Sequence, residues 1–127
     1  MGADADLFVG QWSYRAGAVN HITCAGQSRD VALTGMELLE RGSGGGLEWV
    51  SQSLGCRVPL AVGEDIARVG PGHACHVSAG SNSGTIDLAG STFSLAADAL
   101  VESGLAAVVY DDGRACSGVI TGTLGMP

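Results

Sequence analysis

Short runs of alternating apolar and polar residues, separated by turns rich in glycine and aspartate, constrain this fold most. The alternation is clear at residues 56–62 (CRVPLAV) and 115–124 (ACSGVITGTL), whereas no comparable helical period is present. Turn signals such as RGSGGG at 41–46 and DDG at 111–113 lie between the runs. Many short strands joined by tight turns predict an antiparallel sandwich or barrel.

The order of the runs favours a barrel over a sandwich. Nothing in the chain demands a long crossover connection, and a meander that closes on itself leaves no exposed edge. We predict an all-β fold, an antiparallel up-and-down (meander) barrel of about eight strands. The chain has 127 residues, and we expect residues 8–127 to form a single domain after a disordered polar lead-in at residues 1–7. Residues 31–42 could also pass for a helix, although the alternation of Val31 and Leu33 and the presence of Gly35 favour a strand, and residues 94–103 could hold one helical turn.

The charge balance excludes some classes of partner. The net charge is −7, and all six basic residues are arginines, with no basic cluster among them. Nucleic-acid binding needs phosphate neutralisation by Lys and Arg, so we expect no nucleic-acid partner. No apolar run approaches the roughly 18 residues of a transmembrane helix, so we also expect no transmembrane segment.

The cysteine count points to an oxidising compartment. No two cysteines form a Cys-x-x-Cys pair, which argues against zinc and thioredoxin-like sites. An even number of widely spaced cysteines predicts two disulfides. We therefore expect a secreted, periplasmic or lipid-anchored outer-surface protein whose signal peptide has been removed. The cysteines are Cys24, Cys56, Cys75 and Cys116.

A closed meander also predicts how the cysteines pair. If residues 10–24 form one long strand, bent at Gly17, the first and last strands are antiparallel neighbours. The end of the first strand then lies beside the start of the last strand, close enough for a Cys24–Cys116 disulfide. The remaining pair is Cys56–Cys75.

One motif resembles a known group of barrels. Gly10-Gln11-Trp12, at the head of the first strand, resembles the Gly-x-Trp signature of the calycins, the lipocalins and avidin-like proteins. This resemblance implies a lipocalin- or avidin-like barrel in which the Trp plugs the closed end and an Arg of the last strand packs over it. Arg114, the only Arg of the last strand, lies at the wrong end for that contact.

The chain as a whole is similar to small Cys-containing secreted or lipoprotein β-domains of predatory gliding bacteria. The similar elements are FVGQWSY, SLGCRVPLAV, GHACHVSAG and GRACSGVITGTL. That group is similar to lipocalins in presumed fold and largely lacks an assigned activity. The resemblance therefore implies the fold and not the function.

No catalytic or metal site stands out. His73, Cys75 and His76 could ligate a metal, but an oxidised Cys75 supplies no thiolate, so we expect loop or surface histidines and no cofactor. Acidic pairs such as Asp111-Asp112 lie in turns and suit backbone hydrogen bonding there. Five further carboxylates along the strands are expected to be solvated; these are Glu37, Glu48, Asp87, Asp98 and Glu102.

The aromatic residues are the best candidates for a ligand pocket. Small residues predicted to face inward leave room for a cavity, although Trp packing could fill the same space. They are Gly118, Gly122, Ala97 and Ala99. The expected lining is Trp12, Tyr14, Trp49 and Phe93, with His21 or Asn20 as a polar contact.

The first hypothesis is a non-enzymatic, secreted barrel that binds a small apolar or amphipathic ligand. The first alternative is a protein-interaction or structural module with a filled core, which would act on a protein partner as an inhibitor or surface component. The second alternative is a pocket enzyme, a barrel cyclase or isomerase, that works by positioning its substrate.

Overall fold

A computed structural model describes residues 3–42, 46–51, 55–71, 74–79 and 82–126. Its strands form one continuous antiparallel sheet that closes through the pairing of the last two strands. Eight strands make the closed ring, in the order β12-β1-β4-β5-β6-β7-β10-β11. They are β1 (Gly10–Tyr14), β4 (Met36–Arg41), β5 (Leu47–Ser51), β6 (Cys56–Gly63), β7 (Ile66–Val69), β10 (Thr92–Ala96), β11 (Ala99–Tyr110) and β12 (Ala115–Gly125). The predicted eight-stranded antiparallel barrel is confirmed.

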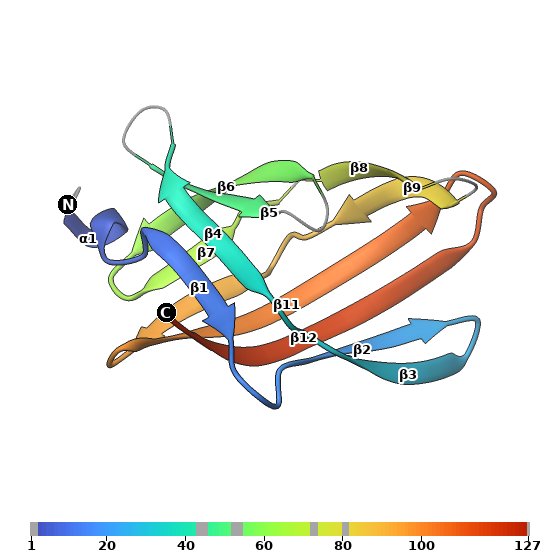
Figure 1. Ribbon diagram of the computed structural model, residues 1–127. Helices are drawn as coiled ribbons and strands as arrows, with labels where there is room; N and C mark the ends of the chain where they lie inside the picture. Colours follow the sequence, from blue (N-terminus) through green and yellow to red (C-terminus); the bar gives the residue numbers. More distant parts are fainter. Residues whose placement is uncertain (1–2, 43–45, 52–54, 72–73, 80–81, 127) are drawn as a thin grey trace.

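Two hairpins extend the barrel at one end. The hairpin of β2 (Val19–Cys24) and β3 (Gln27–Ala32) pairs with β12, and the hairpin of β8 (Ala74–Ala79) and β9 (Asn82–Asp87) pairs with β11. The alternation in the sequence does not predict these extensions. They are possible because β11 and β12 are far longer than the other ring strands and continue past the ring (Figure 1).

The first predicted strand is present as two shorter ones. Tyr14 of β1 lies opposite Leu124, and Val19 of β2 lies opposite Thr121, so both strands run antiparallel to β12 in the same direction. The intervening residues 15–18 loop out, and Gly17 has a φ of 97°, which favours glycine. The bend predicted at Gly17 is therefore an outward loop that interrupts the strand without reversing it.

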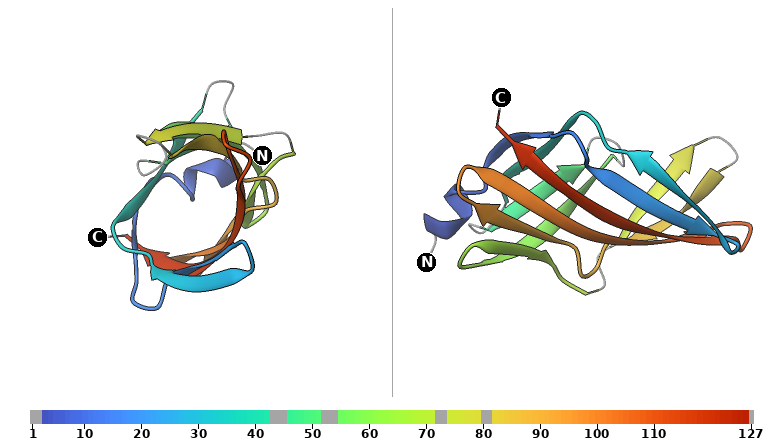
Figure 2. Two further views of the ribbon diagram at one scale, coloured as in Figure 1. Left: turned by 90° about the vertical axis from the view of Figure 1, so that its right-hand side faces the viewer. Right: turned by 90° about the horizontal axis from the view of Figure 1, so that it is seen from below.

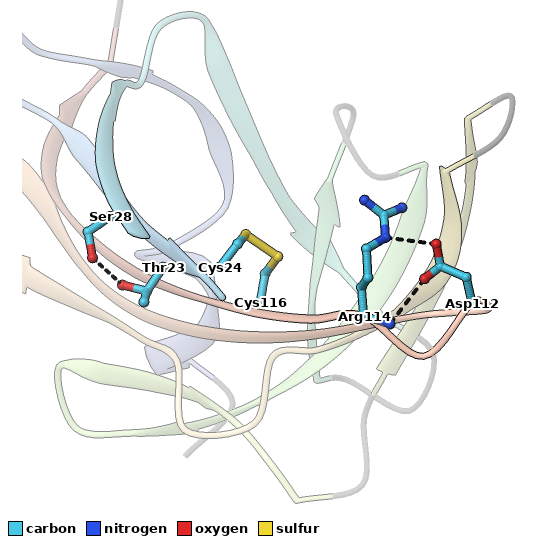
Figure 3. The surroundings of a disulfide bond; sticks show 6 residues. All are labelled: Thr23, Cys24, Ser28, Asp112, Arg114 and Cys116. Carbon is cyan, nitrogen blue, oxygen red and sulfur yellow. Dashed lines mark hydrogen bonds and ion pairs between the residues drawn. A yellow bond between two sulfur atoms is a disulfide. The ribbon is translucent and has the colours of Figure 1, made fainter. Parts of the chain in front are cut away.

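Both disulfides follow from this layout and have the pairing that the sequence predicts. Cys24 and Cys116 are direct cross-strand neighbours on β2 and β12, with 4.4 Å between their Cα atoms (Figure 3). Cys56 and Cys75 join β6 to β8, with 6.0 Å between their Cα atoms. Two disulfides fit an extracellular or otherwise oxidising compartment. No helix in the described part of the chain is long and apolar enough to span a membrane.

The N-terminal end of the barrel is covered by a short helix, α1 (Ala3–Asp6). Looking along the barrel, Figure 2 (left) shows α1 lying across the far end of the ring. Ala5 and the following Phe8 are buried, and Arg41 forms an ion pair with Asp6. Residues 3–7 therefore belong to the folded structure, in contrast to the disordered lead-in that their polar sequence suggested.

The stretches that could have held a helical turn are mostly strand. Residues 31–42 contain the end of β3 and all of β4, and residues 94–103 contain parts of β10 and β11. The apolar residues that point into the ring form a core below α1. Its fully buried members include Phe8, Leu39, Leu47, Phe93, Leu100 and Leu124.

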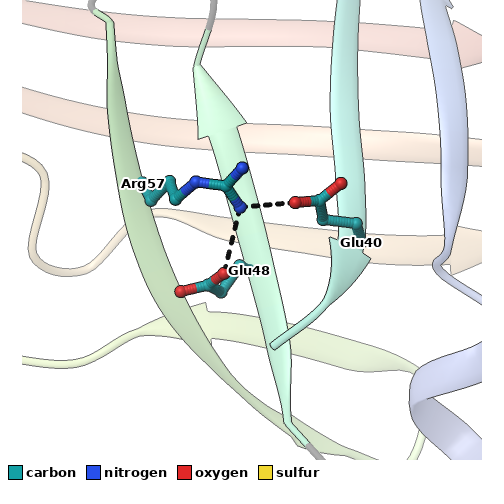
Figure 4. Close-up of polar contacts among 3 residues, drawn as sticks. All are labelled: Glu40, Glu48 and Arg57. Atoms are coloured by element: carbon teal, nitrogen blue, oxygen red, sulfur yellow. Dashed lines mark hydrogen bonds and ion pairs between the residues drawn. The ribbon is translucent and has the colours of Figure 1, made fainter. Parts of the chain in front are cut away.

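The outer face of β4, β5 and β6 carries an ion-pair cluster. The Arg57 guanidinium on β6 donates hydrogen bonds to the carboxylates of Glu48 on the adjacent strand β5 and of Glu40 on β4, one strand farther (Figure 4). These groups are at least partly exposed, and exposed ion pairs contribute little to stability. The outer face of this part of the sheet is therefore polar and faces solvent.

Candidate functional site

An interior cavity of about 270 Å³ lies where the closed ring meets the hairpin extensions. Its lining comes from β1, β2, β4, β5, β9, β11 and β12, from the connection between β3 and β4, and from the connection between β9 and β10. Met36, 43% exposed, is at the cavity's rim. The apolar wall consists of Leu33, Met36, Ile86, Leu88, Ala106, Val108 and Ile120. The polar or aromatic groups are Tyr14, Asn20, Thr34, Glu37, Trp49, Ser51 and Glu102.

Glycines of β12 let two of the polar groups lie across the sheet. A Cβ atom on Gly122 would be 2.7 Å from the Ala18 Cβ and 3.7 Å from a ring carbon of Tyr14. A Cβ atom on Gly118 would be 2.7 Å from the Asn20 Oδ1. The space above these two glycines is occupied by Ala18 and Asn20, so the small residues of the last strand make room for packed side chains, one of which, Asn20, lines the cavity.

The Tyr14 hydroxyl donates a hydrogen bond to the Glu102 Oε1 over 2.6 Å. Glu102, on β11, lies opposite Gly122 in the strand register and is 1% exposed. Burial raises the pKa of Glu102 from its usual 4.5 to about 7, although the hydrogen bond from Tyr14 acts in the other direction. The other carboxylate oxygen, Oε2, is buried without a hydrogen-bond partner in the described part of the chain.

A second buried carboxyl group lines the same cavity. Glu37 of β4 is 6% exposed, and the Trp49 Nε1–H donates a hydrogen bond to its Oε2. Burial raises the pKa of Glu37 to about 7; the Trp49 hydrogen bond lowers it, and the charge of Glu102 raises it. Burial, followed by the charges of both carboxylates, also holds the pKa of Tyr14 above its usual range. The three groups thus form one electrostatically coupled set.

The expectation that all five strand carboxylates are solvated is wrong for Glu37 and Glu102. Each shares a strand face with a buried leucine, Glu37 with Leu39 and Glu102 with Leu100. Period-2 alternation with those leucines is the available signal, but it is ambiguous because Leu38 and Val101 place apolar side chains on the opposite faces of the same strands. The remaining three, Glu48, Asp87 and Asp98, are exposed or half-buried.

Two of the expected ligand contacts, Tyr14 and Trp49, do line the cavity. Phe93 is fully buried behind Trp49, with the ring centroids 5.1 Å apart and an edge-to-face arrangement. Trp12 is buried nearer the start of β1, where its Nε1–H donates a hydrogen bond to the Phe8 carbonyl oxygen over 2.9 Å. It borders a separate apolar depression with Leu95 and Met126.

His21 is not a lining residue. Its side chain is 51% exposed, and its Nδ1 lies 2.6 Å from the Asp30 Oδ1 on the neighbouring strand β3. The even-numbered positions of β2 face inward, so the polar contact in the cavity is Asn20. The Asn20 Oδ1, like the Glu102 Oε2, has no hydrogen-bond partner among the described residues.

The possible metal ligands do not form a site. Cys75 is in a disulfide, and His76 is exposed on β8. His73 lies outside the described residues. Across the described ranges, no group of three or more His, Cys, Asp and Glu side chains is placed to hold a metal ion.

The polar groups that line the cavity are two carboxyl groups, three hydroxyl groups, the Trp49 indole and the Asn20 amide. A Tyr hydroxyl hydrogen-bonded to a carboxyl group whose pKa is near neutrality can bind a polar group or pass a proton. Comparison with known proteins found no family model, curated protein or solved structure that matches this chain.

Proposed function

We propose that this protein binds a small amphipathic ligand in the interior cavity of its barrel. The carrying observation is that an apolar wall and a few convergent polar side chains line the same cavity. Ligand sites are typically concave and mostly apolar, with a small number of polar groups that orient the ligand. Two buried carboxyl groups lower the stability of a barrel core, because burying each of them costs free energy. Their presence in the cavity therefore supports a role in binding.

The cavity volume limits the size of the ligand. At about 270 Å³, it lies near the lower end of the range usual for ligand pockets. Liquid water occupies about 30 Å³ per molecule, so the space holds about nine water-sized groups. The ligand in this proposal is therefore a compact molecule, such as one aromatic ring with a short polar arm.

The proposed setting is outside the cytoplasm: secreted, periplasmic or on the outer surface. The two disulfides support it, because disulfides persist where thiols are not kept reduced. A binding protein in such a place would capture or carry its ligand.

Native mass spectrometry of the protein purified from its own host tests the proposal. We expect a co-purifying small molecule that is released on unfolding. Substitution Ala106→Met should abolish the added mass because Ala106 lines the cavity. Substitution Ala107→Met is the matched control, since Ala107 is exposed on the opposite face of β11. A bound mass that survives Ala106→Met would place the ligand elsewhere.

A second candidate function is proton-transfer catalysis, as in an isomerase or cyclase. The hydrogen-bonded pair of Tyr14 and Glu102 favours it, because a carboxyl group with a pKa near 7 is suited to act as both acid and base at neutral pH. An enzyme of this kind would exchange a ligand C–H proton with solvent. Deuterium incorporation from D₂O into the captured molecule, present with the native protein and lost with Glu102→Gln, would support catalysis. Absence of deuterium incorporation would contradict catalysis and leave ligand binding as the proposed function.

A further inference from the structure

The polar lining of the cavity includes buried hydrogen-bond acceptors without a donor among the described residues. The Tyr14 hydroxyl and the Trp49 Nε1–H, two donors that line it, already donate to Glu102 and Glu37. Two buried acceptor atoms, the Glu102 Oε2 and the Asn20 Oδ1, have no donor among the described residues. A ligand that supplies N–H donors would complement the carboxyl and amide groups of the lining, whereas a ligand with acceptors alone would not.

The charge of the cavity has one sign. Its titratable lining groups are Tyr14 from β1, Glu37 from β4 and Glu102 from β11. The groups that face them from β2, β5, β9 and β12 are uncharged, and no arginine or histidine of the described chain is in the lining. Two buried carboxyl groups without a counter-charge are complementary to a cation.

We propose that the ligand is a small organic amine, whose ammonium group binds at Glu102 and Glu37 and whose apolar part packs on the opposite wall. This inference rests on the proposed function and names the ligand class for the same cavity. An ammonium group brings three N–H donors and a positive charge to a site that has acceptors and negative charge.

The walls suit the rest of such a molecule. Trp49 and Tyr14 present aromatic rings next to the carboxyl groups, and ammonium groups bind favourably over aromatic faces. Ile86, Leu88 and Ile120 provide apolar surface in the same cavity. An arylalkylamine of about ten non-hydrogen atoms fits the available volume.

The amine inference also predicts a pH dependence. Burial places the pKa values of both carboxyl groups near 7, so lowering the pH through this range protonates them and removes the negative charge. Amine affinity should therefore fall as the pH drops from 8 to 5.5, because an alkylamine stays protonated over that interval. The affinity of an uncharged ligand should change far less.

Three probes of one shape separate the possibilities: 2-phenylethylamine, 2-phenylethanol and 3-phenylpropionate. Binding is measured by calorimetry and by Trp fluorescence at pH 8 and pH 5.5, where Trp49 is the reporter in the cavity. At pH 8 we expect the amine to bind at least about tenfold more tightly than the alcohol, as a hydrogen bond to a charged group predicts. The carboxylate should bind most weakly of the three.

Variants locate the charge selectivity. Glu102→Gln and Glu37→Gln should each reduce the preference for amine over alcohol at least about fivefold and flatten its pH dependence. Glu64→Gln, in the exposed turn between β6 and β7, is the matched control and should leave the preference unchanged. The comparison of probes on the native protein needs no variant, so a variant that fails to fold does not block the test.

Each outcome bears on a different claim. Equal binding of amine and alcohol would overturn the amine inference and leave the proposed function standing. An amine preference that both Gln variants retain would also overturn it. Failure of all three probes to bind saturably would overturn the proposed function as well.

Discussion

Replacing Glu102 by Gln should make the protein more stable at alkaline pH. Glu102 is 1% exposed, and its pKa rises from 4.5 to about 7 on folding because burial disfavours the charged form. Gln cannot ionise, yet it keeps a carbonyl oxygen that can accept the hydrogen bond from Tyr14. The substitution therefore removes the cost of a buried charge with little change of shape.

The sign and the size follow from linkage. Below pH 4.5 the carboxyl group is protonated in both the folded and unfolded states; between 4.5 and about 7 it is protonated only in the folded state. Unfolding then releases a proton, so the stability that Glu102 contributes at low pH is lost as the pH rises through about 7. One pKa unit corresponds to about 1.4 kcal/mol, so the loss amounts to about 3 kcal/mol. The loss of the Glu102 charge also lowers the pKa of Glu37, which acts in the same direction.

Urea unfolding at intervals from pH 4 to pH 8.5, followed by Trp fluorescence with the disulfides intact, measures this effect. The difference in unfolding free energy between Glu102→Gln and the native protein should grow by about 3 kcal/mol across the range in favour of the variant. Glu64→Gln, exposed in a turn, should give a constant difference. Parallel curves for Glu102→Gln and the native protein would refute the claim that Glu102 is buried with a raised pKa.

Three further predictions concern the same framework. Tyr14→Phe removes the hydrogen bond that lowers the pKa of Glu102, so the titration midpoint of Glu102 in carboxyl NMR should move to a higher pH. An unchanged midpoint would contradict the hydrogen bond between the two side chains. Gly122→Ala should lower the stability measured by thermal unfolding by about 1–3 kcal/mol, because its Cβ would lie 2.7 Å from the Ala18 Cβ. Gly63→Ala is the control and should lower it far less, because no atom of the described residues beyond its chain neighbours lies within 4 Å of the added Cβ. Removing the disulfide between β2 and β12 should lower the free energy of unfolding by about 4–5 kcal/mol, and removing the one between β6 and β8 should lower it by about 3 kcal/mol, because the disulfides close loops of 92 and 19 residues. The reverse order in urea unfolding would contradict the chain-entropy account.

The barrel could be predicted because its signals are local. Alternation at residues 56–62 and 115–124 and the glycine- and aspartate-rich turns between runs are enough to specify many short antiparallel strands. Closure then brings the first and last strands together, and the pairing of Cys24 with Cys116 follows from that neighbourhood. The hairpin extensions could not be derived in this way, because nothing local distinguishes a strand that closes the ring from one that continues beyond it.

Part of the cavity could also be predicted from the sequence. Tyr14 and Trp49 are aromatic residues on inward positions, and Gly118 and Gly122 leave space on the last strand. Trp12 is on the same face of β1 as Tyr14 but lies nearer the start of the strand, toward the end of the barrel that α1 covers. Parity indicates which face a residue shares with its neighbours, whereas its depth along the barrel depends on the three-dimensional packing.

The sequence by itself determined that the chain forms short, alternating strands in an antiparallel barrel, because alternation and turn residues are properties of neighbours along the chain. Only the tertiary structure decided which face of an ambiguous strand points inward. In β11, Val101, Leu105 and Val109 are exposed, while Glu102 on the opposite face is buried. Apolar residues occupy both faces of that strand, so its own pattern does not choose between them. The choice is made by the register with β12, which places Leu100 opposite Leu124 in the core and so turns Glu102 toward Tyr14.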